Sequence, residues 1–342
     1  MCIYKQCVYG LTKRFSTISS VLNQLKQADP SICLIVTHTH QTASAFLAAD
    51  EYYLEPAGLT GMAYLDWCLA FCRQHRIDTI WPAKEAILFA QQQAMFQAQG
   101  VNVVSVAEPD VLRLLQNKAE FYQTLSPSIA ETMDFIAVNT PSAFAAAVTE
   151  LSAKHKTLCV KPSVSVFGLG FRILDNHHVS IEHLLKGIEY HIPLSELQQG
   201  MANIEHFNTL LVMEHLSGHE WSVDCVAEHG RLLCAVQRQK SLHAGHGQII
   251  DNNDAIHQMV LRLTAYYRLN SIFNIQFKLG VNGPRLLEIN PRPSGGFGMA
   301  CLAGVNLAQL AWQTLTGVAI EAPAIRYGLK ISEVKTPVVL VN

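Results

Sequence analysis

Strand-like and helix-like patterns of apolar residues alternate over the first hundred positions. Short apolar runs typical of buried strands occur at residues 33–37, 79–82 and 101–105. Longer stretches with the period of an amphipathic helix occur at residues 16–28, 61–75 and 85–99. Gly100 follows the last of them, where a helix is expected to end. Strands and helices that alternate with short connections predict a small parallel α/β domain over residues 1–108.

The rest of the chain mixes both patterns without regular alternation. Helical segments are expected at residues 110–116, 119–125 and 144–154, a strand at 158–161, and a mainly helical stretch at 176–208. Strands are expected at 210–214, 220–227, 232–238, 274–281 and 285–289, followed by a helix at 302–316 and a two-stranded tail at 326–341. This order predicts an α+β region over residues 109–342. It divides into a small subdomain at 120–208 and a C-terminal lobe at 209–342.

Composition narrows the class of protein. Hydrophobic residues make up 49% of the 342 residues and charged residues 15%, which argues against a disordered chain. The net charge of -2 gives no basic field, so nucleic acid is not an expected partner. Residues 1–10 lack the apolar core of a secretory signal, and no segment has the length of a membrane helix. We therefore expect no membrane partner and a cytoplasmic location.

Cysteine and histidine are abundant, but their spacing does not favour a metal site. None of the nine cysteines forms a Cys-x-x-Cys pair, and Cys68 and Cys72 share one face of an expected helix. Reduced thiols in the core are favoured there over a disulfide or a metal site. The fifteen histidines are scattered, and His38 and His40 lack nearby cysteine or carboxylate partners in the sequence, so zinc is disfavoured.

The strongest chemical signal is a hairpin-like segment at residues 273–296. Glu288 and Asn290 are two apart on its second expected strand, so their side chains leave on one face. Gln276 on the first strand is placed to join them, and three oxygen donors suit Mg²⁺. Arg292 follows and brings a guanidinium to whatever the metal binds. The competing interpretation is an ordinary hairpin with a solvated polar face.

This segment resembles the metal-binding motif of the ATP-grasp enzymes, notably the carbamoyl-phosphate synthetase large chain and its amino-acid and peptide ligase relatives. The matching residues are Gln276 and the run Leu-Glu-Ile-Asn-Pro-Arg-Pro-Ser-Gly-Gly at 287–296. The resemblance implies that Gln276, Glu288 and Asn290 hold magnesium and that Arg292 contacts the transferred phosphate. It also implies an ATP-grasp fold, of α/β and α+β class, in which an N-terminal pre-ATP-grasp domain at 1–108 precedes the ATP-grasp domain at 109–342.

Two lysines resemble the family's phosphate contacts. Lys161 ends an expected strand, and Ser165 and Gly168 follow in a segment that is similar to the phosphate-covering loop. Lys118 lies about forty residues earlier, where the family places a basic residue against the nucleotide phosphates. An exposed lysine without a ligand is the competing interpretation of each position.

The segment at 210–224 resembles the strand that binds adenine. The resemblance implies that backbone groups near Glu214 and Leu216 bind the adenine edge and that Glu220 bonds the ribose hydroxyls. Glu220 could instead simply begin an amphipathic strand. In the segment at 237–248, Arg238, Lys240 and His243 are implied to line the phosphate and acceptor region.

The resemblance implies an ADP-forming ligase that uses ATP and Mg²⁺, with the nucleotide between the small subdomain and the C-terminal lobe. A substrate carboxylate is phosphorylated, and an amine or thiol then displaces phosphate, so the partners are small-molecule carboxylates and amines. Positioning and charge neutralisation are expected to supply most of the catalysis. Two alternatives stay open: a kinase that phosphorylates a hydroxyl, and a nucleotide-binding regulatory module without turnover. The sequence also leaves a homodimer open.

Overall fold

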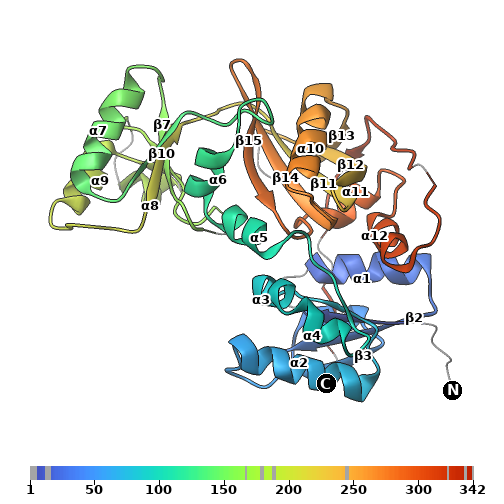
Figure 1. Ribbon diagram of the computed structural model, residues 1–342. Coiled ribbons are helices and arrows are strands. Elements are labelled where there is room, and N and C mark those ends of the chain that lie inside the picture. The colour runs from blue at the N-terminus through green and yellow to red at the C-terminus, as the bar shows by residue number, and fades with distance from the viewer. Residues whose placement is uncertain are drawn as a thin grey trace. The chain divides into compact units, whose positions relative to one another are not determined.

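The structure is a computed structural model that describes residues 6–11, 17–165, 168–177, 181–186, 190–242, 246–321, 323–334 and 337–340. The chain forms two compact units. Unit 1 contains Met1–Arg113, His219–Phe277 and Glu288–Asn342. Unit 2 contains Leu114–Gly218 and Lys278–Leu287. Figure 1 shows the elements that form each unit.

The N-terminal part of unit 1 is a five-stranded parallel sheet with strand order β3-β2-β1-β4-β5. Its elements are β1 (Gln6–Leu11), α1 (Thr17–Ala28), β2 (Ile32–His38), η1 (Ser44–Ala48), β3 (Glu51–Leu54), α2 (Gly61–His75), β4 (Thr79–Trp81), α3 (Ala86–Gln91), α4 (Gln93–Gln97) and β5 (Asn102–Val103). All seven residues of β2 are buried, which explains its continuous apolar run. The predicted parallel α/β arrangement is confirmed.

The cysteines of α2 are core residues. Cys68 and Cys72 are buried and free, as predicted. Burial raises the pKa of Cys72 to about 12 and that of Cys68 further still, so both thiols stay protonated at pH 7. The expected single helix at 85–99 is wrong, because Gln92 leaves helical geometry (φ −103°, ψ 20°) and separates α3 from α4.

Unit 2 is built on a second five-stranded sheet, with strand order β6-β10-β7-β8-β9. The elements of this part of the chain are α5 (Pro109–Gln116), α6 (Lys118–Thr124), β6 (Phe135–Val138), α7 (Pro141–Ser152), β7 (Leu158–Pro162), β8 (Arg172–Leu174), α8 (Ile181–Lys186), β9 (His191–Ile192), α9 (Leu194–Met201) and β10 (Leu210–Glu214). Asn117 caps α6, and Thr140 caps α7. In the described part of 176–208 the predicted helices are present as α8 and α9, and the two-residue strand β9 between them extends the sheet.

A six-stranded sheet with the order β15-β14-β11-β12-β13-β16 follows. Its region contains β11 (Glu220–Glu228), β12 (Arg231–Lys240), β13 (Gln248–Asp251), α10 (Asp254–Tyr266), β14 (Ser271–Gly280), β15 (Gly283–Asn290), α11 (Phe297–Cys301), α12 (Leu307–Thr316) and β16 (Lys330–Ile331). Figure 1 shows α10 lying along this sheet, and it contacts β12. The expected two-stranded tail is wrong for the described residues after 325, where β16 pairs with β13 instead.

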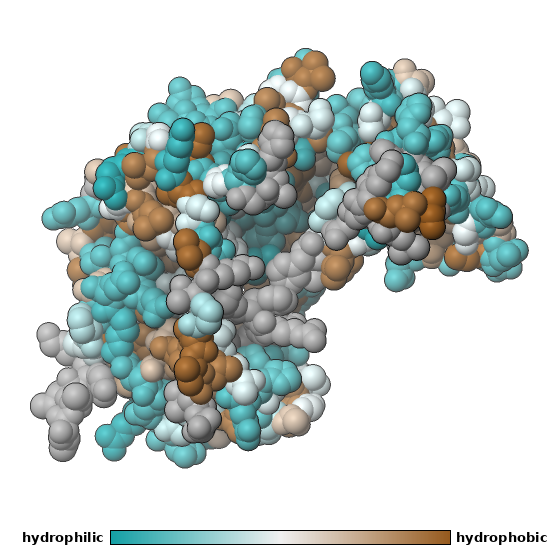
Figure 2. Space-filling model, turned by 180° about the vertical axis from the view of Figure 1, so that it is seen from behind, coloured by the Kyte–Doolittle hydropathy of each residue, from teal (hydrophilic) through white to brown (hydrophobic). Residues whose placement is uncertain are grey.

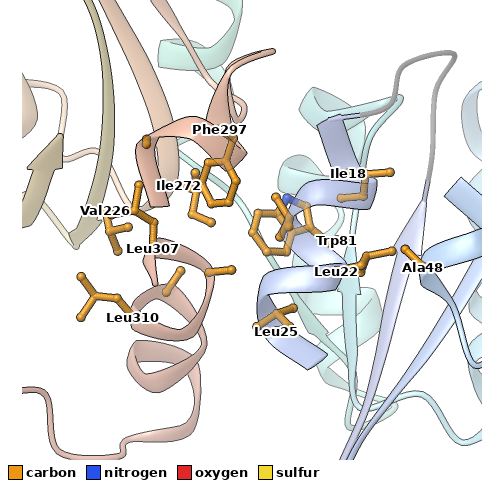
Figure 3. Packing of buried hydrophobic residues seen from close by; sticks show 14 of the residues in the cluster. Ile18, Leu22, Leu25, Ala48, Trp81, Val226, Ile272, Phe297, Leu307 and Leu310 are labelled. Atoms are coloured by element: carbon orange, nitrogen blue, oxygen red, sulfur yellow. The ribbon is translucent and has the colours of Figure 1, made fainter. Parts of the chain in front are cut away.

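The core of unit 1 joins its N-terminal sheet to its C-terminal helices. Ile18, Leu22 and Leu25 of α1 share one buried cluster with Phe297 of α11 and Leu307 of α12 (Figure 3). A hydrogen bond of 2.7 Å from Nδ2 of Asn306, the N-cap of α12, to the carbonyl of Gln24 ties the same helices together. The two parts of unit 1 therefore share a continuous core.

On the face in Figure 2, hydrophilic residues predominate and apolar ones are scattered among them. No helix in the described part of the chain is long and apolar enough to cross a bilayer.

Candidate functional site

Glu288, Asn290 and Arg292, here called the Glu288 array, lie at the end of β15 and in the loop after it. Nδ2 of Asn290 donates a hydrogen bond of 2.9 Å to Oε1 of Glu288. Nη2 of Arg292 donates to Oδ1 of Asn290 over 3.4 Å, and Nη1 donates to the carbonyl of Pro293 over 3.1 Å. Since alternate residues of a strand share a face, the array presents a carboxylate, an amide and a guanidinium side by side.

The donor set around Glu288 fits magnesium. Gln276 lies on β14, the neighbour of β15, and its half-buried side chain points away from the buried Ile275 and Phe277. With Glu288 and Asn290 it offers one carboxylate and two amide oxygens. Mg²⁺ is commonly held by one or two carboxylates, while phosphate oxygens and water complete its shell. Within the described residues there is no cluster of three or more His, Cys, Asp and Glu side chains that could hold a metal.

Arg238 of β12 lies in the interior, at 1% exposure. Its Nε and Nη2 donate to Oδ2 of Asp224 over 3.1 and 2.8 Å. Nη2 also donates to Oγ of Ser294, 2.7 Å away in the loop after Arg292. The contacts of Arg238 with Asp224 and Ser294 were not predictable from the sequence, because these residues are 14 and 56 positions away and only the folded sheet brings them together.

Glu220 and Lys240 form an ion pair at the adjoining ends of β11 and β12. Both side chains are partly exposed, at 25% for Glu220 and 37% for Lys240. Nδ1 of His219 lies 3.1 Å from the carbonyl of Lys240. The carboxylate expected at the ribose and the lysine expected at the acceptor side are therefore direct neighbours. His243 lies outside the described residues.

Lys118 is held against the predicted phosphate loop. Its Nζ donates to the carbonyl of Ser165 over 3.0 Å, and its backbone nitrogen donates to the carbonyl of Ser163 over 3.0 Å. Oγ of Ser163 accepts from the backbone nitrogen of Ala119 at 3.0 Å. Gly168 has a φ of +68°, which an L side chain rarely adopts. The beginning of this loop, from Ser163 to Ser165, is thus anchored to the start of α6.

Lys161, at the end of β7, lies against the aromatic side chain of Tyr122, for which no role was predicted. Its Nζ is 3.1 Å from the hydroxyl of Tyr122 and 5.3 Å from the centre of that ring. The hydroxyl donates in turn to the carbonyl of Leu287. Tyr122 follows Lys118 by four positions on α6, and this helical spacing was the available signal.

The predicted adenine strand is β10, which pairs with β6 and β7. It ends at Glu214, and β11 begins at Glu220, so the backbone around Leu216 lies between strands. Oε1 of Glu214 is 3.6 Å from Nδ1 of His155. Burial, with the nearby charges of Lys278 and His191, lowers the pKa of His215 to about 4, so this side chain is neutral at pH 7.

A second polar cluster lies at the carboxyl edge of the N-terminal sheet. Glu55 is buried, and its Oε2 lies 2.5 Å from Nζ of Lys84. Oε1 accepts hydrogen bonds from Thr37 over 2.8 Å and from Tyr64 over 3.2 Å. Lys84 therefore neutralises an interior carboxylate.

Two family models match the chain. Residues 206–337 match the ATP-grasp family described as ATP-grasp in the biosynthetic pathway with Ter operon. Residues 9–104 match the PylC-like N-terminal domain. The sequence of residues 206–337 is thus that of an ATP-grasp family member. The first model spans every residue of the predicted metal set and of the Glu288 array, and the second spans nearly all of the N-terminal parallel sheet.

Solved ATP-grasp structures show the same fold. The biotin carboxylase domain of 2-oxoglutarate carboxylase from Hydrogenobacter thermophilus, in complex with MgADP, ADP and bicarbonate, aligns at a TM-score of 0.66 and 15% identity, over 94% of this chain and 72% of that one. N5-carboxyaminoimidazole synthetase from Staphylococcus aureus complexed with ADP aligns at 0.65 and 14%, over 93% and 79%. An L-amino acid ligase from Bacillus licheniformis aligns at 0.62 and 13%, over 91% and 74%. The predicted ATP-grasp fold with an N-terminal parallel α/β domain is confirmed.

A curated relative adds a similarity in sequence. Human carnosine synthase 1 is 35% identical over 102 residues, which is 26% of this chain and 12% of the relative. The chain therefore matches only a small part of the length of carnosine synthase 1.

Proposed function

We propose that the protein is an ATP-dependent, ADP-forming ligase that joins a small-molecule carboxylate to an amine or a thiol. The observation that carries the proposal is the Glu288 array, whose carboxylate, amide and guanidinium adjoin one another within the part of the chain that matches the ATP-grasp family. Solved proteins of the same fold named as a synthetase and an amino acid ligase support the class of reaction.

Each unit contributes its own part of the proposed machinery. In unit 2, Lys118 and Lys161 neutralise nucleotide phosphates, and the backbone near Leu216 binds the adenine edge. In unit 1, Glu220 bonds the ribose. The anchored segment from Ser163 to Ser165 and the pairing of Lys161 with Tyr122 support the phosphate role, because they fix two cations near the loop before any ligand arrives.

Gln276, Glu288 and Asn290 would hold Mg²⁺, which supplies charge neutralisation for ATP phosphates when bound. Arg292 binds the transferred phosphoryl group through its planar fork. The substrate carboxylate attacks the γ-phosphorus in line, the bond to the bridging oxygen breaks, and ADP leaves with that electron pair. The nitrogen or sulfur nucleophile then adds to the acyl phosphate carbonyl and expels inorganic phosphate.

Product analysis tests this chemistry. Purified protein is incubated with Mg²⁺, γ-labelled ATP and a panel of carboxylates, with hydroxylamine in place of the natural nucleophile. We expect ADP release and a hydroxamate with at least one carboxylate, because hydroxylamine traps an acyl phosphate. A stable phosphate ester that resists hydroxylamine would identify a kinase instead. Nucleotide binding without ADP release across the panel would support a regulatory module.

A further inference from the structure

Arg238 is hydrogen-bonded inside the protein at all three of its nitrogens. All three of its nitrogens are engaged, since Nη1 donates to Oε1 of Gln248 in addition to the bonds of Nε and Nη2 to Asp224. Nη2 also donates to Oγ of Ser222 over 3.0 Å. The side chain is 2% exposed and every nitrogen bonds to an interior group, which favours a role through other residues.

Asp224, the partner of Arg238, binds two atoms of Ser294 in the loop that follows the Glu288 array. Asp224 accepts from the backbone nitrogen of Ser294 over 3.3 Å and from its hydroxyl over 3.0 Å. The same hydroxyl accepts from Arg238 over 2.7 Å. Ser294 is two residues after Arg292, so this double attachment restricts the backbone that carries the Arg292 guanidinium.

The loop is also shaped to lie against Arg238. A Cβ atom at Gly296 would lie 2.4 Å from Nη1 and 2.8 Å from Cζ of Arg238, so a side chain there would force the bonded guanidinium to shift. Only glycine lets the loop backbone reach the flat guanidinium so closely. The Ser-Gly-Gly that follows Pro293 therefore has a structural explanation within this chain: serine bonds to the ion pair, and Gly296 packs on it.

From this geometry we infer that Asp224 and Arg238 are positioning residues that fix the loop at residues 291–296, and so place Arg292 for phosphoryl transfer. The placement of Arg292 for phosphoryl transfer rests on the proposed function. The ordering of the loop at 291–296 does not rest on it, because the loop is ordered in the protein without ligand. A buried ion pair of this kind contributes little net stability, so a role in fixing one geometry is a reason for its presence.

The test uses hydrogen exchange of the ligand-free full chain. Arg238→Lys keeps the charge but cannot make the fork to Asp224 and Ser294, and Ser294→Ala removes only the hydroxyl. We expect both to raise exchange of the amides at 291–296 about tenfold, the equivalent of one charge-assisted hydrogen bond. Arg231→Lys is the matched control on the same strand, because Arg231 is exposed and pairs with Glu228 at the surface.

Turnover and binding give the second readout. In Arg238→Lys and Ser294→Ala we expect kcat for ADP release to fall at least tenfold with KM for ATP unchanged, because a loosened Arg292 affects the transition state more than nucleotide binding. Exchange that stays unchanged at 291–296, or that rises uniformly over unit 1, contradicts the inference. Absence of ADP release from the wild-type protein contradicts the proposed function and leaves the exchange result as the test of the loop.

Discussion

Glu288→Gln is expected to reduce ADP formation by about 10²- to 10³-fold while ATP still binds within severalfold of the wild-type affinity. Glutamine keeps the size of the side chain and the oxygen that accepts from Nδ2 of Asn290. It removes the single carboxylate of the donor set, and Mg²⁺ prefers charged oxygen. The adenine and ribose contacts proposed near Leu216 and Glu220 are unaltered. Isothermal titration with ATP and a coupled ADP assay measure the two effects separately.

Glu228→Gln is the matched control for this change. Glu228 lies on β11 in the same unit, is partly exposed, and pairs with Arg231 at the surface. The control should retain full ADP formation, because a surface ion pair contributes little to stability. Turnover in Glu288→Gln equal to that of the control would show that Glu288 holds no catalytic metal.

Lys84→Met is expected to destabilise the protein by about 3 kcal/mol, since it leaves the carboxylate of Glu55 buried without its cation. The side chain of Glu55 is 1% exposed and that of Lys84 19%. Nζ of Lys84 also lies 3.8 Å from the centre of the Tyr64 ring, so the methionine keeps the packing and loses only the charge. Urea unfolding followed by tryptophan fluorescence measures the change, because Trp67 and Trp81 both lie in the N-terminal sheet region.

A double variant distinguishes the ion pair from general loss of packing. Glu55→Gln keeps an oxygen for the hydrogen bonds from Thr37 and Tyr64 but removes the charge. In Glu55→Gln with Lys84→Met we expect most of the lost stability to return, because neither charge is left unpaired. A double variant as unstable as Lys84→Met alone would mean that packing and not charge explains the loss.

Helices and strands were predictable where the pattern of apolar residues along the chain matches the face that the element buries. The continuous apolar run of β2 and the three-to-four spacing of α2 reflect the faces that they bury, so their positions were predictable. The break between α3 and α4 was not, because it depends on the geometry of one residue, Gln92, within a helical pattern. The two-stranded tail predicted at 326–341 was wrong because β16 pairs with β13, a strand about eighty residues earlier in the chain.

The candidate site likewise has contacts that were predictable from the sequence and contacts that were not. Alternation along one strand was enough to place Glu288 beside Asn290, and the structure adds their hydrogen bond. The environment of Arg238 was not predictable, because Asp224, Ser222 and Ser294 come from two other segments. Arg238 is also buried, and its burial depends on the packing of the whole sheet.

The melting temperature of the wild-type protein shows whether it binds ATP together with magnesium. A ligand that binds only the folded state adds about 2.7 kcal/mol of stability at one hundred times its Kd. We predict a clear upward shift with millimolar Mg-ATP, a smaller one with ATP and EDTA, and none with Mg²⁺ alone. An identical melting temperature in all conditions would contradict the account.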